Sequence, residues 1–342
     1  MTATTAASSG PDAAARRRPR RWRRVLAIAG AVLGGILLIL GGLAAWFLYA
    51  PSPDEPGLAA TVERHAIEVD GMDREYVAVV PDGIAADAPV VLAFHGSRMD
   101  AEGMRAAAGY RFDELAVERG FVAVYPEGYE MTWHGCRAET PYPARLEDVD
   151  DVAFVRAVVA DLAAELGTSA DEVYATGLSN GGHMSIRLGA EAPGLVNAIA
   201  PFAAAYPAES NNTCTPSGEA VPTMFVLGTD DPINPFEGGE AGGIAGSLGE
   251  VLSAADSAAH VAGLNGSDGD AQSAVFTNTD ATGETDVTLT AYAGDAPTLL
   301  FAVEGGGHVV PNPNYTQPRI MGGTTEHLDG PLAAVEFFLG EG

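Results

Sequence analysis

The sequence predicts an α/β domain with a mostly parallel central sheet flanked by helices, preceded by one transmembrane helix. Three observations support this prediction: short apolar runs alternate with helical segments, 47% of the 342 residues are apolar, and a long uncharged run lies near the N-terminus. Continuous apolar runs are typical of strands buried on both faces, as in parallel sheets. The composition excludes the collagenous, low-complexity and disulfide-scaffold classes.

Charge is distributed unevenly along the chain. The 18 Lys and Arg residues face 46 Asp and Glu residues, for a net charge of −28, and every basic residue is Arg. Seven Arg and one acid, Asp12, lie in the first 50 residues, so this part carries +6 and the remainder −34. Because phosphate neutralisation needs clustered Arg or Lys, the acidic remainder argues against nucleic acid and anionic membrane surfaces as its partners.

The N-terminal region predicts a membrane anchor. An Arg-rich head, residues 1–24, precedes an apolar run, residues 25–50, that is long enough for the roughly 20-residue helix needed to cross a bilayer. The positive-inside rule places the head in the cytoplasm and everything after the helix outside. A cleaved secretory signal is the alternative, with Gly42-Leu43-Ala44 as the candidate cleavage site. Residues 51–60 are expected to form a linker, and residues 61–342 the soluble domain, whose oligomeric state the sequence leaves open.

The elements of the soluble domain are expected in the following order. A hairpin of strands 65–69 and 75–80, joined by Asp70-Gly71, forms an antiparallel leading edge. Acids open the helix at 148–167 and Gly167 closes it. Region 236–285 is the least patterned and is interpreted as either an active-site rim or a disordered insert, with one helix around 248–261. The other expected strands are 89–94, 121–125, 173–177, 196–202, 223–227, 287–292 and 298–303, and the other helices are 101–119 and 332–339.

Two cysteines, Cys136 and Cys214, lie in expected loops of a domain that is predicted to be exported. Oxidising conditions outside the cytoplasm allow such a pair to bond, so the sequence favours a single disulfide over a metal site.

A candidate nucleophile lies in Gly177-Leu178-Ser179-Asn180-Gly181, which follows an expected strand and opens a helical segment. In this context the pattern is typical of a strained strand-to-helix turn that exposes Ser179. Only glycine at 177 and 181 lets the strand and the helix approach closely enough. An ordinary Gly-Ser turn is the alternative interpretation.

A neutral serine needs a base to remove its proton and an acid to orient that base. His308 follows strand 298–303 through a glycine-rich loop and is the expected base, with His327 as its rival. The acid is expected after strand 223–227, in the chain order Ser, Asp, His. The residues alone leave this choice open between Asp230 and Asp231, because either could instead shape the turn that follows.

Donors for a developing oxyanion are expected at two strand ends. The backbone N–H of Asn180 follows the nucleophile, and His95-Gly96-Ser97 follows strand 89–94, with Ser97 as the expected donor. His95 itself is interpreted as shaping this loop rather than as a base. The chemistry requires no metal and no cofactor.

Several stretches together resemble a known family, the α/β-hydrolase esterases grouped as polyhydroxybutyrate depolymerase-like and feruloyl or acetylxylan esterase-like (carbohydrate esterase family 1-like). The resemblance implies an α/β-hydrolase fold, Asp231 as the catalytic acid, a non-catalytic Asp230 and His308 as the base. One departure, Val309-Val310-Pro311-Asn312 after the histidine, bears on substrate rather than mechanism. The matching stretches are Phe94-His95-Gly96, Tyr125-Pro126-Glu127-Gly128, Val149-Asp150-Asp151-Val152-Ala153-Phe154, Tyr174-Ala175-Thr176-Gly177-Leu178-Ser179-Asn180-Gly181-Gly182, Gly228-Thr229-Asp230-Asp231-Pro232-Ile233 and Gly306-Gly307-His308.

The sequence therefore predicts a membrane-anchored, externally facing serine esterase that hydrolyses carboxylic esters through an acyl-enzyme on Ser179. The expected substrate is an ester, either a small molecule or a polymer. An acyltransferase or a serine peptidase could use the same triad, because fold and triad do not choose the acyl acceptor. A catalytically silent surface-binding domain is the alternative from another class of protein.

Overall fold

The computed structural model describes residues 2–3, 19–243, 246–267, 270–276, 286–325 and 327–341. The chain divides into two compact units, Met1–Tyr49 and Ala50–Gly342. Part of the expected Arg-rich head, residues 4–18, lies outside the described residues. The same holds for residues 244–245, 268–269 and 277–285 of the weakly patterned region.

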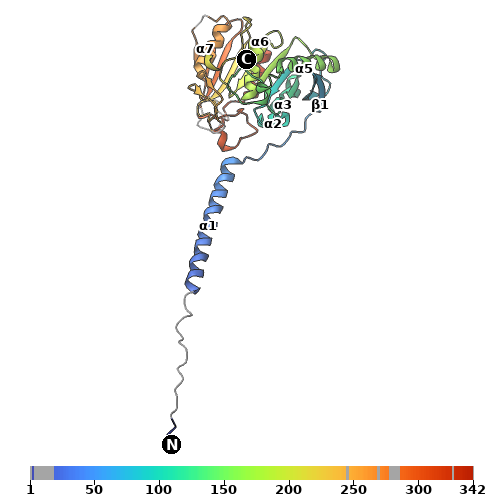
Figure 1. Cartoon of the computed structure of the whole chain (residues 1–342). Helices are drawn as coiled ribbons and strands as arrows, with labels where there is room; N and C mark the ends of the chain where they lie inside the picture. Colours follow the sequence, from blue (N-terminus) through green and yellow to red (C-terminus); the bar gives the residue numbers. More distant parts are fainter. Residues whose placement is uncertain are drawn as a thin grey trace. The chain divides into compact units, whose positions relative to one another are not determined.

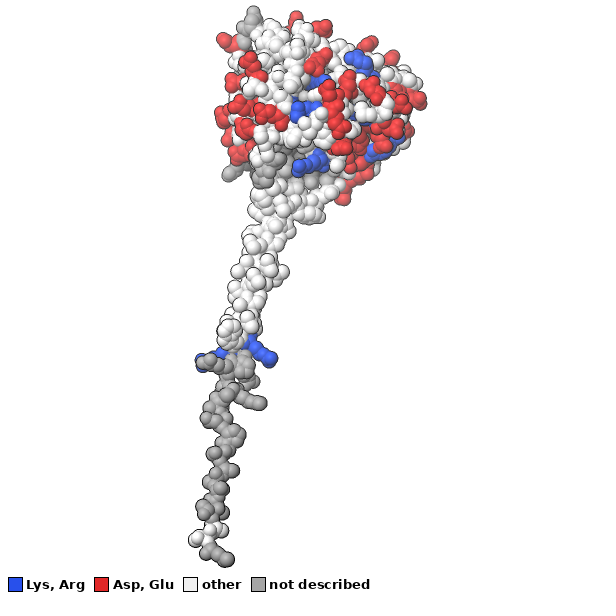
Figure 2. Space-filling model, viewed as in Figure 1, with Lys and Arg blue, Asp and Glu red and all other residues white. Residues whose placement is uncertain are grey.

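The first unit contains one long helix, α1 (Pro19–Leu48), which begins six residues before the apolar run that predicted it. Its segment Arg21–Leu48 is long and apolar enough to cross a membrane, and a signal sequence would meet the same criteria of length and composition. Figure 2 shows this helix almost without charge beyond the arginines at its start. The single N-terminal apolar helix of the prediction is thus present.

The second unit is built on a ten-stranded sheet (Figure 1). Its six central strands are parallel, and antiparallel strands extend it at both edges. The predicted α/β class with a mostly parallel sheet is therefore confirmed. The strands, from one edge to the other, are β1 (Ala60–Val69), β2 (Met72–Pro81), β4 (Val122–Pro126), β3 (Val90–Phe94), β5 (Val173–Leu178), β6 (Ala198–Phe202), β7 (Thr223–Gly228), β12 (Thr298–Val303), β11 (Val287–Tyr292) and β10 (Gln272–Phe276).

Helices cover both faces of the sheet. One apolar core joins side chains of α2 (Ala101–Ala107), α3 (Arg111–Arg119) and α8 (Gly330–Leu339) to one face. Further cores join α5 (Asp151–Leu166), α6 (Asn180–Glu191) and α7 (Ala254–Leu264) to the other. The remaining short elements are α4 (Pro143–Leu146), the 3₁₀ turns Glu209–Asn211 and Arg319–Met321, and the two-stranded β8 (Gly239–Glu240) and β9 (Glu250–Val251).

Local sequence explains several boundaries. The predicted hairpin turn is present, because Asp70 and Gly71 both have positive φ angles, 51° and 78°, as a two-residue turn between twisted strands requires. Helix α5 begins at the capping side chain of Asp150, which accepts the N–H of Ala153, and it ends at Gly167 in the left-handed region.

Two predictions for the elements were wrong. The single helix expected at 101–119 is two helices, because Gly109 and Tyr110 both have positive φ angles, 63° and 57°, which no helix can accommodate. The weakly patterned region holds strands that were not expected, β8, β9 and β10, and its helix, α7, begins at Ala254 rather than near 248.

The predicted disulfide is present. Cys136 and Cys214 are bonded, with their Cα atoms 5.0 Å apart and a sequence separation of 78. The bond joins the loop after β4 to the loop after β6, and it holds the first of these loops against the start of α6, where Gly135 contacts His183.

Candidate active site

The nucleophile candidate lies in a strained turn between β5 and α6. Ser179 has φ 57° and ψ −113°, a combination that L-residues rarely adopt, and its side chain is partly exposed. Two backbone bonds hold the turn: the Ser179 N–H donates to Phe202 O at 2.9 Å, and the His183 N–H donates to Ser179 O at 3.0 Å. The strain is thus fixed from β6 on one side and from the first turn of α6 on the other.

Glycine is required on both sides of this serine for a steric reason. A Cβ on Gly177 would lie 2.8 Å from the Phe94 carbonyl oxygen, and a Cβ on Gly181 would overlap the same carbonyl. The neighbouring strand β3 therefore approaches the turn backbone to backbone, which only residues without a side chain allow.

The structure brings His308 and Asp231 together at the same sheet edge as Ser179. The Nδ1 atom of His308 lies 2.8 Å from Oδ2 and 3.0 Å from Oδ1 of Asp231. The two residues follow β12 and β7, which are adjacent parallel strands, and both side chains are buried. Because the carboxylate engages Nδ1, Nε2 is the ring nitrogen that remains for the serine proton.

Asp231 and Asp230 occupy different environments. Asp231 is buried, and its Oδ1 accepts the backbone N–H groups of Ile233 and Asn234, each at 2.8 Å. Asp230 is exposed, and its N–H donates to Gly306 O at 2.9 Å. Of the two candidate acids, only Asp231 bonds to the histidine. His327, the rival base, is buried in the loop before α8, where its N–H donates to Thr325 Oγ1 at 3.0 Å.

Both expected oxyanion donors lie beside the nucleophile. Asn180 is the first residue of α6, so its N–H has no acceptor within the helix. Its side chain is locked by two bonds to the backbone of Trp133, an acceptor contact at 2.7 Å and a donor contact at 3.1 Å. On the other side, a Cβ on Gly96 would lie 3.7 Å from Cβ of Ser179, which puts Ser97 next to the turn.

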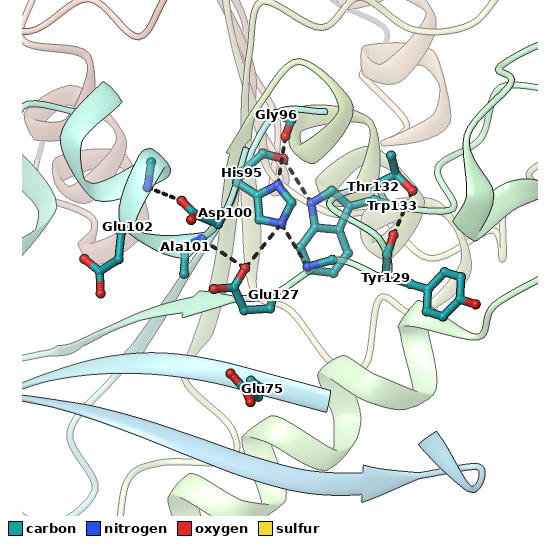
Figure 3. Close-up of polar contacts among 12 residues, drawn as sticks. Glu75, His95, Gly96, Asp100, Ala101, Glu102, Glu127, Tyr129, Thr132 and Trp133 are labelled. Carbon is teal, nitrogen blue, oxygen red and sulfur yellow. Dashed lines mark hydrogen bonds and ion pairs between the residues drawn. The ribbon is translucent and has the colours of Figure 1, made fainter. Parts of the chain in front are cut away.

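His95 holds the loop that leads to Ser97 through several polar contacts, and Figure 3 shows those with Gly96 and Trp133. Its Nδ1 lies 2.8 Å from Gly96 O, its Nε2 accepts the N–H of Gly128 at 2.8 Å, and its own carbonyl accepts the Trp133 indole N–H at 3.0 Å. Burial lowers the pKa of His95 to about 4, so the ring is neutral at pH 7. A neutral ring with both nitrogens occupied fits the loop-shaping interpretation.

Sequence reasoning missed two residues of this region. Trp133 positions Asn180 through its backbone, and the hydroxyl of Tyr142 donates to Ser97 Oγ at 3.2 Å. Both lie in the loop that carries Cys136, so the cysteine spacing was the one available signal that this loop could reach the start of α6.

Comparisons with known proteins found related sequences and solved structures that resemble this chain. No family model matches the chain. A protein named "Putative esterase NocK" from Nocardia uniformis subsp. tsuyamanensis is 29% identical over 307 residues, which cover 85% of this chain and 87% of that protein. "Probable feruloyl esterase C" from Aspergillus niger is 25% identical over 172 residues, covering 48% of this chain and 58% of that protein. The solved structure of an acetyl xylan esterase from Aspergillus awamori is 16% identical, covers 73% of this chain and 95% of that chain, and has a TM-score of 0.48.

The class that the sheet and these relatives indicate is that of the α/β-hydrolase esterases. The relative that is similar over most of its length is named an esterase, and the shorter match is named a feruloyl esterase. The resemblance predicted from the motifs is therefore confirmed at the level of the class.

Proposed function

We propose that this protein is a serine esterase that hydrolyses carboxylic esters through an acyl-enzyme on Ser179. The observation that carries the proposal is the buried hydrogen bond between His308 Nδ1 and Asp231. Both residues follow strands that end at the same edge of the sheet as the strained turn at Ser179. A histidine held in this tautomer is suited to accept a proton on Nε2. The esterase relatives support the same class of reaction.

In the first half of the reaction, His308 Nε2 takes the proton of the Ser179 hydroxyl while Oγ attacks the ester carbonyl carbon. The carbonyl oxygen becomes an oxyanion, and the N–H groups of Asn180 and Ser97 are its proposed donors. The C–O bond to the alcohol then breaks, and the imidazolium gives its proton to the departing alkoxide. The buried carboxylate of Asp231 stabilises the imidazolium during both steps.

In the second half, water attacks the acyl-enzyme. His308 removes a proton from the water, the same donors hold the second oxyanion, and the bond between the acyl carbon and Ser179 Oγ breaks as the serine regains its proton. The products are an alcohol and a carboxylic acid. In this proposal the ester and water are the reactants, and the groups that act on them are side chains and backbone N–H groups of this chain.

The names of related proteins support a proposal for the substrate class. One relative is named a feruloyl esterase and another a bifunctional acetylxylan esterase/xylanase. We infer that short acyl or aromatic acyl esters, carried on a small molecule or on a polymer, are the substrates, with polyhydroxyalkanoates as a further polymer of the same ester chemistry.

The N-terminal helix is proposed to anchor the enzyme with its catalytic domain outside the cytoplasm. Arg21, Arg23 and Arg24 open the apolar helix and favour a cytoplasmic N-terminus. The disulfide fits an oxidising compartment on the far side of the membrane. Cleavage of the same helix would instead release a secreted enzyme. Mass measurement of the protein from membrane and medium fractions distinguishes the two fates.

The test compares ester hydrolysis by the full-length protein, solubilised in mild detergent, with that of Ser179→Ala. Nitrophenyl esters of short and long acyl chains, methyl ferulate and acetylated xylan are the probes. Ser185→Ala is the matched control, because Ser185 lies on the same helix and its hydroxyl only donates to Gly181 O at 3.3 Å. We expect Ser185→Ala to match the wild type and Ser179→Ala to lose at least about 10⁴-fold in kcat. Retained hydrolysis in Ser179→Ala would overturn the proposal.

A further inference from the structure

Arg137 is a buried cation that lacks a carboxylate partner among the described residues. Its side chain is 3% exposed, and its Nε and Nη2 atoms have no hydrogen-bond partner. The other buried arginines differ: Arg74 pairs with Asp151 at 2.8 Å, and Arg105 pairs with Asp113 at 2.8 Å. A buried charge without a counter-ion costs several kcal/mol. The chain has 46 Asp and Glu residues, yet none of those described pairs with Arg137. Folding stability alone therefore does not account for Arg137.

Tyr142 lies between Arg137 and Ser97, the expected oxyanion donor after β3. Burial lowers the pKa of Arg137 to about 10, and the Tyr142 side chain beside the guanidinium acts in the opposite direction. The Tyr142 hydroxyl in turn donates to Ser97 Oγ at 3.2 Å. Ser97 follows Gly96, where an added Cβ would lie 3.7 Å from Cβ of Ser179. Arg137, Tyr142 and Ser97 thus form a series of polar side chains between the buried cation and the edge of the candidate active site.

A second observation places the charge of Arg137 near the nucleophile. Gly135, two residues before Arg137, packs against His183, and burial, followed by the positive charge of Arg137, holds the pKa of His183 well below its usual value. His183 lies one helical turn after Ser179, and its N–H donates to the Ser179 carbonyl. The guanidinium therefore acts on the first turn of the nucleophile's helix as well as on Tyr142.

We propose that Arg137 and Tyr142 are positioning residues that turn the Ser97 hydroxyl into an additional donor for the oxyanion. The inference rests on the esterase function proposed above. In this proposal the Arg137 guanidinium polarises the Tyr142 hydroxyl, which donates to Ser97 Oγ. A serine hydroxyl has one hydrogen and two acceptor sites, so a bond received from Tyr142 leaves that hydrogen to be donated elsewhere. Ser97 can give it to the substrate oxygen beside Ser179.

The physical effect of this series is electrostatic. Hydrogen bonds that run in one direction polarise one another, so each donor makes the next a stronger donor. No carboxylate among the described residues cancels the charge of Arg137, and the dielectric constant around a buried group is low. Its field therefore favours negative charge at the oxyanion, which exists only in the transition state and the tetrahedral intermediate. The expected effect is on kcat and not on KM.

The first test removes one hydroxyl. Tyr142→Phe should lower kcat by roughly 10- to 100-fold, less than the loss of a direct oxyanion donor, with KM changed by less than about twofold. Its affinity for a trifluoromethyl ketone, which forms a tetrahedral adduct on serine, should fall by the same factor as kcat. Tyr129→Phe is the matched control, because the Tyr129 hydroxyl donates to exposed Glu147 at 2.8 Å, and it should behave as the wild type.

A double-mutant cycle tests the direction of the relay. If Tyr142 acts through the Ser97 hydroxyl, Tyr142→Phe should cost nothing further in a Ser97→Ala background. Independent, multiplicative losses would overturn the relay. Arg137→Lys keeps the charge and should retain more kcat than Arg137→Gln, with melting temperatures measured for each. If Arg137→Gln fails to fold, the cycle at Tyr142 and Ser97 still decides.

The outcomes separate this inference from the function on which it rests. If Ser179→Ala abolishes hydrolysis while Tyr142→Phe keeps the wild-type kcat, the esterase stands and the relay is wrong. If Tyr142→Phe raises KM and leaves kcat unchanged, Tyr142 is a substrate contact and the relay is again wrong. If Ser179→Ala retains hydrolysis, the proposed function itself fails.

Discussion

Replacing Asp231 by Asn tests the His308–Asp231 pair with almost no change in shape. The Oδ1 atom of Asp231 accepts the N–H groups of Ile233 and Asn234, so the position it occupies must hold an acceptor. In Asp231→Asn the amide oxygen therefore takes this position, and the NH₂ group takes the place of Oδ2, 2.8 Å from His308 Nδ1. Two donors cannot face each other, so Nδ1 must become the acceptor and the ring proton moves to Nε2.

The proton then occupies the nitrogen that has to accept it from Ser179. In a serine hydrolase of another fold, a wrong tautomer of this kind lowers kcat by about 10⁴, which corresponds to roughly 5.5 kcal/mol of transition-state stabilisation. We expect a loss of 10³- to 10⁴-fold here, measured with nitrophenyl acetate at pH 7.5. Because the two backbone bonds survive, the melting temperature should change by only a few degrees.

Asp230→Asn is the matched control, since Asp230 is exposed and adjacent in sequence. It should keep the wild-type kcat. Asp231 does not orient His308 in this way if Asp231→Asn, folded as judged by circular dichroism, hydrolyses the ester within tenfold of the wild type, or if the control loses as much activity.

Three further predictions concern stability. Burial lowers the pKa of His95 to about 4 in the folded chain, against 6.5 in the unfolded chain. Below pH 6.5 the unfolded chain therefore binds a proton that the folded chain excludes, and the free energy of unfolding should fall by about 2 kcal/mol between pH 7.5 and pH 5. Replacing both Cys136 and Cys214 by Ser should lower the free energy of unfolding by about 4 kcal/mol, because the bond closes a loop between residues with a sequence separation of 78. Gly181→Ala should cost more than about 2 kcal/mol and abolish activity, because the new methyl group meets the Phe94 carbonyl.

Denaturant unfolding measures all three, each against its own control. The His95 contribution is read as the difference in pH dependence between the wild type and His95→Gln, and equal slopes in the two proteins would contradict it. Reduced wild type should match the double serine variant, and an unchanged midpoint in both would show that the disulfide contributes nothing. Gly263→Ala, at a helical glycine with open space around it, should be neutral or stabilising; if Gly181→Ala behaves alike, the close approach of β3 is wrong.

The sequence predicted most of the sheet because its central strands are buried on both faces. Strands β11 and β12 begin and end at the expected residues, and β5 and β7 extend one residue further. Strand β10 was missed because it lies at the edge and carries polar and exposed side chains, such as Val275 at 64% exposure, so no apolar pattern marks it.

The break between α2 and α3 has a cause that lies elsewhere in the chain. A Cβ on Gly109 would overlap the Asn312 side chain, and Asn314 Nδ2 donates to Gly109 O at 3.0 Å. These partners are about 200 residues away, so no local pattern could reveal that the backbone turns at this point. Helix propensity alone predicted one continuous helix, and tertiary contacts decided otherwise.

Some residues of the candidate site could likewise be predicted from the sequence, and others could not. The motif around Ser179 lies between an expected strand and an expected helix, so the nucleophile could be predicted from the residues. The choice between Asp230 and Asp231 could not, because it depends on which carboxylate faces Ile233, Asn234 and His308 in space. The roles of Trp133 and Tyr142 depend on a loop that the disulfide fixes, and their neighbours lie far from them in sequence.

Covalent labelling of the nucleophile is the sharpest test of catalysis by Ser179. The full-length protein is incubated with a nitrophenyl phosphonate ester, which serine hydrolases attack but cannot release, and its mass is then measured before and after proteolysis. We expect one adduct per chain, on the peptide that contains Ser179, with nitrophenol release and loss of esterase activity in step. We also expect no adduct in Ser179→Ala and much slower labelling in His308→Ala. An adduct on another residue, or full hydrolytic activity after complete labelling of Ser179, would contradict catalysis by this serine.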